Sequence, residues 1–261
     1  MARSFLFAQD SGDAATTRLI ATAAQATGFM KGEPGAARAG WYQPGADNSA
    51  MLKELHGALV GTYPRISPAF HAVRLWTNLT WQPAYLAVIA AHLHGAMPEL
   101  SGLSQQRRGI HIDGYRLRPV AQTAGAAEAL ILDGGSQLKS MAATMLEEVN
   151  QIVRLRPLPA RRLLADRMLS LMVWLGQRRR DLPREAIMAW SEQWLDVLGL
   201  TGQGMLQPID AEGGQRLLIV RRKGCCLDYL ITPGLYCASC PKQDDAVRVA
   251  RQSANALAEL A

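Results

Sequence analysis

Residues 221–242 read RRKGCCLDYLITPGLYCASCPK and contain every cysteine of the 261-residue chain. The four cysteines form an adjacent pair, a ten-residue spacer and a Cys-x-x-Cys motif, at Cys225, Cys226, Cys237 and Cys240. A cysteine that serves only as a small buried hydrophobe can stand anywhere in a core. The clustering therefore indicates that the four sulfurs share one task.

Four clustered thiolates suit either a zinc ion or an iron–sulfur cluster, and the Cys-x-x-Cys half is common to both. The adjacent pair is more informative. Neighbouring cysteines at the end of a strand point in opposing directions, so binding one metal atom requires a bend there. Gly224 can supply unusual backbone angles for that bend. A larger [2Fe–2S] core is easier to span from such a pair, which favours iron–sulfur chemistry while leaving zinc open.

The residues around the cysteines are basic. A [2Fe–2S] core with four thiolates carries a net negative charge, and four cations bracket the predicted ligands: Arg221, Arg222, Lys223 and Lys242. A helix predicted after Pro241 would turn its N-terminus, which has partial positive charge, towards the sulfurs. Such groups help to set a reduction potential. The alternative is that these residues serve solubility alone. Arg222 and Lys223 are also the candidates for substrate contact.

This segment resembles the FhuF-type ferric-siderophore reductase family, whose hallmark is two adjacent cysteines, a ten-residue spacer and Cys-x-x-Cys, usually followed by proline. The residues that match this pattern are Arg222, Cys225, Cys226, Leu227, Tyr229, Cys237, Cys240 and Pro241. The resemblance implies that the four cysteines bind one [2Fe–2S] cluster. It also implies an oxidoreductase that passes single electrons to Fe³⁺ held by a siderophore, with the hydroxamate type favoured.

The implied reaction needs no acid–base residues, and none is proposed. Hydroxamate and catecholate oxygens are hard ligands that hold Fe³⁺ tightly and Fe²⁺ less so. One electron therefore converts a tight chelate into a labile one. No nicotinamide or flavin motif is visible, so the electrons are expected from a partner protein such as a ferredoxin or a flavoprotein reductase. The implied fold is an α-rich, palm-like domain similar to part of the siderophore synthetases.

Two other functions compete with this one. The first is a protein with a structural Cys₄ zinc site and a basic body that binds nucleic acid or another protein. The second is an iron–sulfur electron carrier without siderophore specificity. The net charge of +6 is thinly spread, in short runs such as residues 178–180. Such runs are more typical of solvated helix faces than of a nucleic-acid surface, so no nucleic-acid partner is expected.

The chain has the composition of a globular protein, with 49% hydrophobic and 19% charged residues. Its N-terminal apolar run, residues 5–8, is too short for a secretory signal. The most apolar stretch, residues 84–97, falls short of the roughly 18–20 residues that span a bilayer. We therefore expect no transmembrane segment and a cytoplasmic location, with transient contact at the inner membrane surface left open. Clustered cysteines in a reducing cytosol favour metal ligands or redox thiols over disulfides.

Other patterns carry less chemistry. His92 and His94 are two residues apart, which separates them by roughly 200° around a helix, so they cannot share an ion there. No metalloprotease, serine-hydrolase or phosphate-loop motif occurs in the sequence. Five tryptophans fall in helical patterns that favour core packing over binding: Trp76, Trp81, Trp174, Trp190 and Trp194.

The predicted fold is helix-rich α+β, with an α-helical palm-like body, a small antiparallel sheet and a short C-terminal module. A loop is predicted over 31–48, a hairpin over 109–120 about Asp113-Gly114, a strand over 129–132, a linker over 199–214 and a strand over 215–223. Helices are predicted over 13–29, from 49, over 67–81 and 83–95, from 136 to 156, and over 160–178, 184–198 and 243–259. The predicted domains are a siderophore-binding body, residues 1–215, and a [2Fe–2S]-binding module, residues 216–261.

Overall fold

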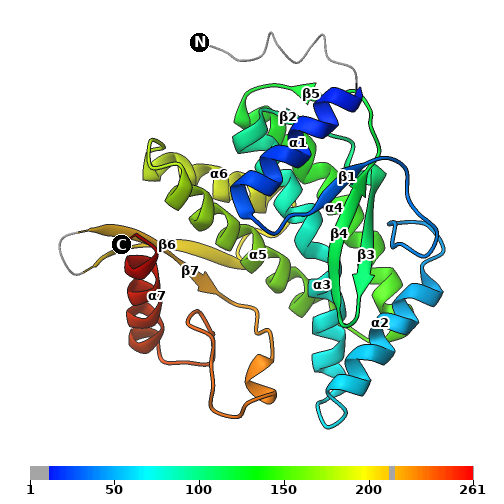
Figure 1. Ribbon diagram of the computed structural model, residues 1–261. Helices are drawn as coiled ribbons and strands as arrows, with labels where there is room; N and C mark the ends of the chain where they lie inside the picture. Colours follow the sequence, from blue (N-terminus) through cyan, green and yellow to red (C-terminus); the bar gives the residue numbers. More distant parts are fainter. Residues whose placement is uncertain (1–11, 212–214, 261) are drawn as a thin grey trace. The chain divides into compact units, whose positions relative to one another are not determined.

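A computed structural model describes residues 12–211 and 215–260, and the chain divides into two compact units, 1–155 and 156–261 (Figure 1). The predicted division between 215 and 216 does not coincide with this boundary. Strand β6 (Gly204–Asp210) pairs along its length with β7 (Arg216–Arg222), and helix α5 (Pro157–Arg178) contacts both strands. Because paired strands form one hydrogen-bonded element, the strand that leads to the cysteines belongs with the helices before it. The roles assigned to body and module stay predictions.

The helix-rich α+β prediction is confirmed. The helices of the first unit are α1 (Gly12–Thr27), α2 (Ser49–Thr62), α3 (Pro68–Ile89) and α4 (Ala127–Ile152), with a π-helical turn at Ala90–His94 and a 3₁₀ turn at Leu100–Gly102. Its strands are β1 (Gly32–Pro34), β2 (Ala96–Met97), β3 (Leu103–Arg108), β4 (His111–Leu117) and β5 (Thr123–Ala124). Strand β4 lies between β1, to which it is parallel, and antiparallel β3, while β2 pairs with β5.

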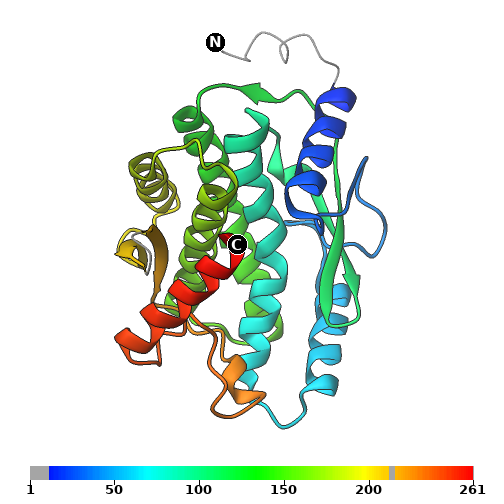
Figure 2. The same cartoon turned by 60° about the vertical axis from the view of Figure 1, so that its left-hand side comes forward.

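Helix α3 forms the centre of the first unit. It contacts α1, α2 and α4 (Figures 1 and 2). Most of its side chains are buried, including Trp76 at 2% exposure. The predicted interruption near Pro83 does not occur, since the helix runs on to Ile89. The end near Gly95 is confirmed, because this glycine adopts the left-handed conformation that closes the π-helical turn.

The predicted hairpin exists, but its turn lies elsewhere. Strands β3 and β4 are joined through Gly109 and Ile110, and Gly109 has a φ of 61°. The dipeptide Asp113-Gly114 lies inside β4. Gly114 also has a positive φ, 89°. It lies in β4 opposite the point between Gln105 and Arg107 where the register of β3 and β4 shifts. The Asp-Gly pair thus marks a special backbone conformation, and here that conformation belongs to a bulge rather than to a turn.

The strand predicted over 129–132 was wrong, because those residues lie in α4. This helix begins at Ala127 and continues through Gly134 and Gly135, both of which are buried. Glycine weakens a helix by about 1 kcal/mol relative to alanine, and tertiary packing overrides that preference here. The run of apolar residues before the glycines belongs to a buried helical face.

The second unit contains a hairpin and three helices within its described residues. Besides α5, its helices are α6 (Arg184–Val197) and α7 (Asp245–Leu260), with a 3₁₀ turn at Asp228–Leu230. The prediction of a linker over 199–214 was wrong, because the described part of this range, 199–211, contains β6. Its glycine and proline content is typical of a loop, but Pro208 can stand in β6 because that strand pairs, within the described ranges, with β7 alone. Helix α7 contacts β7 (Figure 2).

No helix of the described ranges 12–211 and 215–260 is both long and apolar enough to cross a membrane. The N-terminal residues 5–8 lie outside these ranges.

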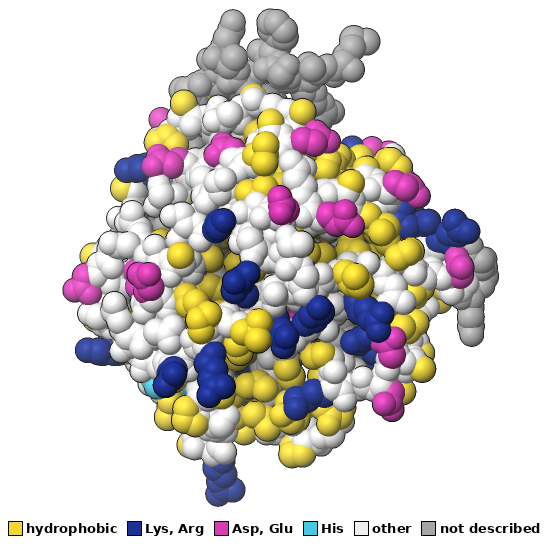
Figure 3. Space-filling view, turned by 180° about the vertical axis from the view of Figure 1, so that it is seen from behind, with side chains coloured by type: hydrophobic (Ala, Val, Ile, Leu, Met, Phe, Trp, Pro, Cys, Tyr) yellow, Lys and Arg dark blue, Asp and Glu magenta, His cyan; other side chains and the backbone are white. Residues whose placement is uncertain are grey.

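Lys and Arg side chains on the face in Figure 3 are interspersed with hydrophobic and uncharged ones.

A carboxylate anchors the predicted loop of the first unit. Glu148, on α4, accepts hydrogen bonds from the Tyr42 hydroxyl, the Gly45 amide at 3.1 Å and the Asn48 side chain at 3.0 Å. Tyr42 is fully buried. The residues from 42 to 48 are therefore ordered by a side chain that is distant in the sequence.

We expect Glu148→Gln to lower the free energy of unfolding by about 2 kcal/mol, because one acceptor oxygen of this network becomes a donor. Chemical denaturation followed by circular dichroism measures the change. Glu147→Gln, at the exposed neighbouring position, is the matched control and should unfold like the wild type. Equal losses in the two variants would contradict the anchoring role.

Candidate metal centre

The four cysteines come together after β7, and all of them are free thiols. The thiol of Cys226 is hydrogen-bonded to that of Cys237, Cys237 to Cys240, and Cys240 to Cys225, a set that we call the sulfur row. Cys240 is buried at 2% exposure, and the other three are half-buried. Residues that are up to fifteen positions apart in the sequence thus form one continuous set of soft donors.

The sulfurs differ in acidity. Its hydrogen bond with Cys226 lowers the pKa of Cys237 to about 7, and the positive charge of Arg222 acts in the same direction, whereas burial opposes them. The same bond, together with burial, raises the pKa of Cys226. Burial raises the pKa of Cys240. Cys237 is therefore more readily present as thiolate, the form that binds metal, than Cys226 or Cys240.

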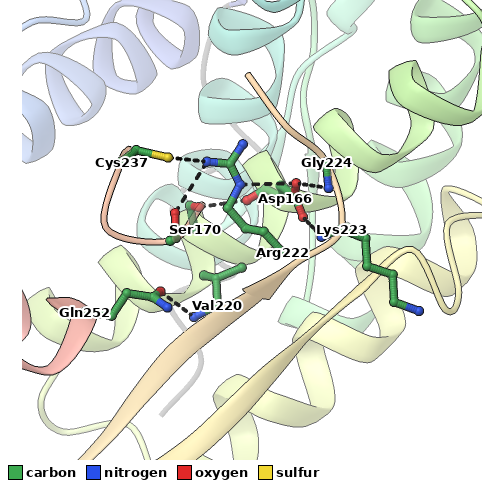
Figure 4. A network of polar contacts seen from close by, with 9 residues as sticks. Asp166, Ser170, Val220, Arg222, Lys223, Gly224, Cys237 and Gln252 are labelled. Carbon is green, nitrogen blue, oxygen red and sulfur yellow. Dashed lines mark hydrogen bonds and ion pairs between the residues drawn. The ribbon is translucent and has the colours of Figure 1, made fainter. Parts of the chain in front are cut away.

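Arg222 reaches the row from the end of β7. Its Nη1 donates to the Cys237 sulfur at 3.7 Å and to the Ser239 hydroxyl at 3.4 Å, while its Nε donates to the Asp166 carboxylate at 3.2 Å (Figure 4). Burial by itself would lower the pKa of Arg222, but the charges of Asp166, Cys237 and Cys226 raise it. The guanidinium is thus a fixed cation between a carboxylate and the sulfurs.

The turns around the cysteines supply further donors. Backbone amides of Asp228 and Lys242 donate to the sulfurs of Cys226 and Cys240 respectively. The Cys240 amide donates to the Cys237 carbonyl at 3.0 Å, which closes the Cys-x-x-Cys turn. The Gln243 side chain donates to the same carbonyl at 2.7 Å. These contacts order the backbone of the loop on either side of the Cys-x-x-Cys motif.

Gly224 serves a different purpose from the predicted one, since it is not among the glycines with positive φ. A Cβ at this position would lie 2.6 Å from Asp166 Oδ2 and 3.0 Å from backbone atoms of Arg162 and Leu163. Its missing side chain therefore permits close approach to α5. The unusual backbone angle occurs at Leu227, whose φ is 63°. The bend thus follows the adjacent cysteines rather than preceding them.

The other predicted cations have separate partners. Arg221 pairs with Asp245 at 3.1 Å, in the first turn of α7, and Lys223 Nζ donates to the Gly202 carbonyl at 2.8 Å. Lys242 is the second cation close to the sulfurs. Its ammonium lies 5.0 Å from the Tyr229 ring centroid, and its interactions with Tyr229 and Cys225 raise its pKa. Of the flanking cations, Arg222 and Lys242 are the ones brought to the row.

The ten-residue spacer presents aromatic and apolar groups. The rings of Tyr229 and Tyr236 are 5.6 Å apart, centroid to centroid. Ile231 and Leu235 are exposed, the latter at 64%. A partly exposed aromatic and apolar surface therefore lies in the segment between the two pairs of cysteines.

Four thiols are a donor set that fits a [2Fe–2S] cluster, and they are also the ligand set of a structural zinc ion. Among the described residues, no three His, Cys, Asp or Glu side chains are arranged to hold one metal ion. Zinc would require all four thiolates to converge on one point. A [2Fe–2S] cluster shares four thiolates between two irons.

No protein-family model matches the chain, and no solved structure matches it. The resemblance to ferric-siderophore reductases therefore depends on the cysteine segment. Sequence reasoning missed Asp166, Ser239 and Gln243. Asp166 lies in the apolar pattern of α5, far from the cysteines in sequence, and only the fold brings it to Arg222.

Proposed function

We propose that this protein is a ferric-siderophore reductase, in which Cys225, Cys226, Cys237 and Cys240 hold a [2Fe–2S] cluster. The cluster, when bound, would donate one electron at a time to Fe(III) in the chelate, which becomes Fe(II). The observation that carries the proposal is the row of four neighbouring sulfurs that follows from the unusual spacing of the cysteines. The proposed setting is the cytoplasm, where thiols stay reduced.

Three hydrogen-bond donors to the sulfurs support electron transfer. Arg222 donates an N–H to the Cys237 sulfur, and donors of this kind stabilise the more negative, reduced state. The amides of Asp228 and Lys242 act in the same way at Cys226 and Cys240. The chain needs to contribute no proton to the reaction, because a change of charge on iron alone weakens its binding to hard oxygen ligands.

The surface of the spacer supports an acceptor of this type. The half-buried rings of Tyr229 and Tyr236 and the exposed Leu235 offer apolar contact, and Lys242 adds one positive charge. A chelate in contact with these residues would lie beside the sulfur row. We propose a hydroxamate siderophore as the substrate and a separate donor protein, a ferredoxin or a flavoprotein reductase, as the source of electrons.

Single-turnover kinetics test the proposal. Protein reduced with a chemical reductant and freed from its excess is mixed anaerobically with a ferric hydroxamate siderophore. We expect reoxidation of the cluster, followed by its visible absorbance, to be faster than with a ferric aminocarboxylate chelate. The gallium(III) form of the same siderophore accepts no electron, and an excess of it should slow the reaction by competition. Equal rates with both ferric chelates would refute the substrate assignment.

Metal analysis tests the cofactor independently. Protein purified without oxygen should contain iron and acid-labile sulfide in equal amounts. Colourless protein with stoichiometric zinc and neither iron nor sulfide would overturn the cluster and favour the structural zinc site.

A further inference from the structure

A buried carboxylate on α5 lies behind the sulfur row. The Asp166 side chain is only 3% exposed, and it accepts hydrogen bonds from Arg222 Nε at 3.2 Å, the Lys223 amide at 3.3 Å and the Gly224 amide at 2.8 Å (Figure 4). Burial raises the pKa of Asp166, and the Arg222 charge and the two amides oppose that shift. Burying a carboxylate is costly unless it is paired and hydrogen-bonded, and these three donors meet that requirement.

Two glycines leave room for this contact. A Cβ on Gly224 would approach Asp166 Oδ2 to 2.6 Å. A Cβ on Gly204, at the start of β6, would approach Asp166 Oδ1 to 3.3 Å and Leu169 Cδ1 to 2.9 Å. Gly204 is also the register partner of Arg222 across the hairpin. The open end of the β6–β7 hairpin is therefore packed onto α5 around this one carboxylate.

Asp166 is connected to both halves of the cysteine motif. Through the Gly224 amide it holds the backbone immediately before Cys225-Cys226. Through Arg222 it holds the guanidinium that donates to the Cys237 sulfur. Arg222 is 14% exposed and lies between the two groups, so its direction depends on the carboxylate.

We propose that Asp166 is a positioning residue for the cluster: it fixes Arg222 against the Cys237 sulfur and fixes the chain that leads into the adjacent cysteines. The inference rests on the proposed function only in taking the bound group to be a [2Fe–2S] cluster. A guanidinium held at a ligand sulfur stabilises the state of greater negative charge, so this pair supports both retention of the cluster and its reduction.

The main test compares Asp166→Asn with Asp181→Asn. Asp181 forms an ion pair with Arg179 in the same unit, but its side chain is 64% exposed, so it is a matched control for the same chemical change. In Asp166→Asn we expect the cluster to be lost to an iron chelator about tenfold faster, and the EPR spectrum of the reduced cluster to change. Asp181→Asn should behave like the wild type. If the rate of cluster loss and the EPR spectrum of Asp166→Asn are both those of the wild type, the proposal is overturned.

Changes at Arg222 separate positioning from general stability. Arg222→Gln removes the cation and should shift the midpoint potential downwards. Arg222→Lys keeps the charge and should give a potential closer to that of the wild type. If Asp166 acts through Arg222, the Asp166→Asn/Arg222→Gln double variant should lose its cluster no faster than the more severe single variant. Additive effects of the two changes, or equal potentials for the Gln and Lys variants, would refute the assignment.

These measurements do not depend on siderophore turnover. A wild-type protein that binds the cluster but does not reduce ferric siderophores would refute the proposed function and leave the role of Asp166 intact. Normal siderophore reduction together with an Asp166→Asn cluster of wild-type stability and spectrum would refute the positioning role alone. Circular dichroism of each variant without its cluster confirms that the comparison is made on folded protein.

Discussion

Replacing Cys226 with serine should abolish the visible absorbance of the cluster and most of the bound iron and sulfide, while the helical circular dichroism spectrum persists. Cys226 is the thiol that hydrogen-bonds to Cys237, and serine offers a hydroxyl that is a much poorer ligand for iron. The apolar core is built elsewhere, and Cys226 is only half-buried, so the fold should tolerate the change.

The matched control for this experiment is Thr232→Ala, which alters an exposed side chain in the same spacer. This variant should retain the cluster. Iron and sulfide contents of Cys226→Ser equal to those of the control would show that Cys226 is not a ligand. Loss of the helical spectrum in Cys226→Ser would show that the fold depends on this half-buried side chain.

Replacing Gly224 with alanine should be the most disruptive single methyl addition near the site. The new Cβ would lie 2.6 Å from the Asp166 carboxylate and 3.0 Å from two backbone atoms of α5, and a helix backbone cannot move aside as a flexible side chain can. Overpacking of this kind costs about 2–3 kcal/mol, and here it also pushes the chain away from Asp166. We expect a lower free energy of unfolding and a faster loss of the cluster.

Gly57→Ala is the comparison for this second change. Gly57 lies in α2, and a Cβ there would have no atom within 4 Å. Alanine should therefore be neutral or stabilise the protein by up to about 1 kcal/mol. Denaturation curves for the two variants measure the difference. A Gly224→Ala protein as stable as Gly57→Ala, with unchanged cluster retention, would show that the close packing around Asp166 is not required.

The fold could be predicted where a pattern is local. Helices α2, α5 and α6 have apolar periodicity and clear starting residues, and they lie close to the predicted ranges. The sequence predictions are wrong where strand pairing or burial in the core decides the secondary structure. Strand β6 has the composition of a linker, because only its pairing with β7 makes Gly204 and Pro208 part of a strand. Residues 129–132 have strand-like composition, but their burial in α4 decides their structure.

The candidate site shows the same limit. The cysteine spacing was enough to predict that four sulfurs come together, because both halves of the motif lie in one segment. The part played by Arg222 could be anticipated from its charge and position. Asp166 could not be found in this way, since it lies 56 residues before Arg222 and nothing in the pattern of α5 distinguishes it from a surface acid.

The packing of Gly204 and Gly224 around Asp166 bears on how related chains can be recognised. The cysteine pattern alone describes a set of ligands, and unrelated proteins can arrive at such a set independently. The support for the ligands has three further features. Asp166 lies on α5, Gly204 begins β6, and Gly224 follows the end of β7. A chain with all these features would share this support as well as the ligands, whereas a chain with the cysteines alone would share only the ligands.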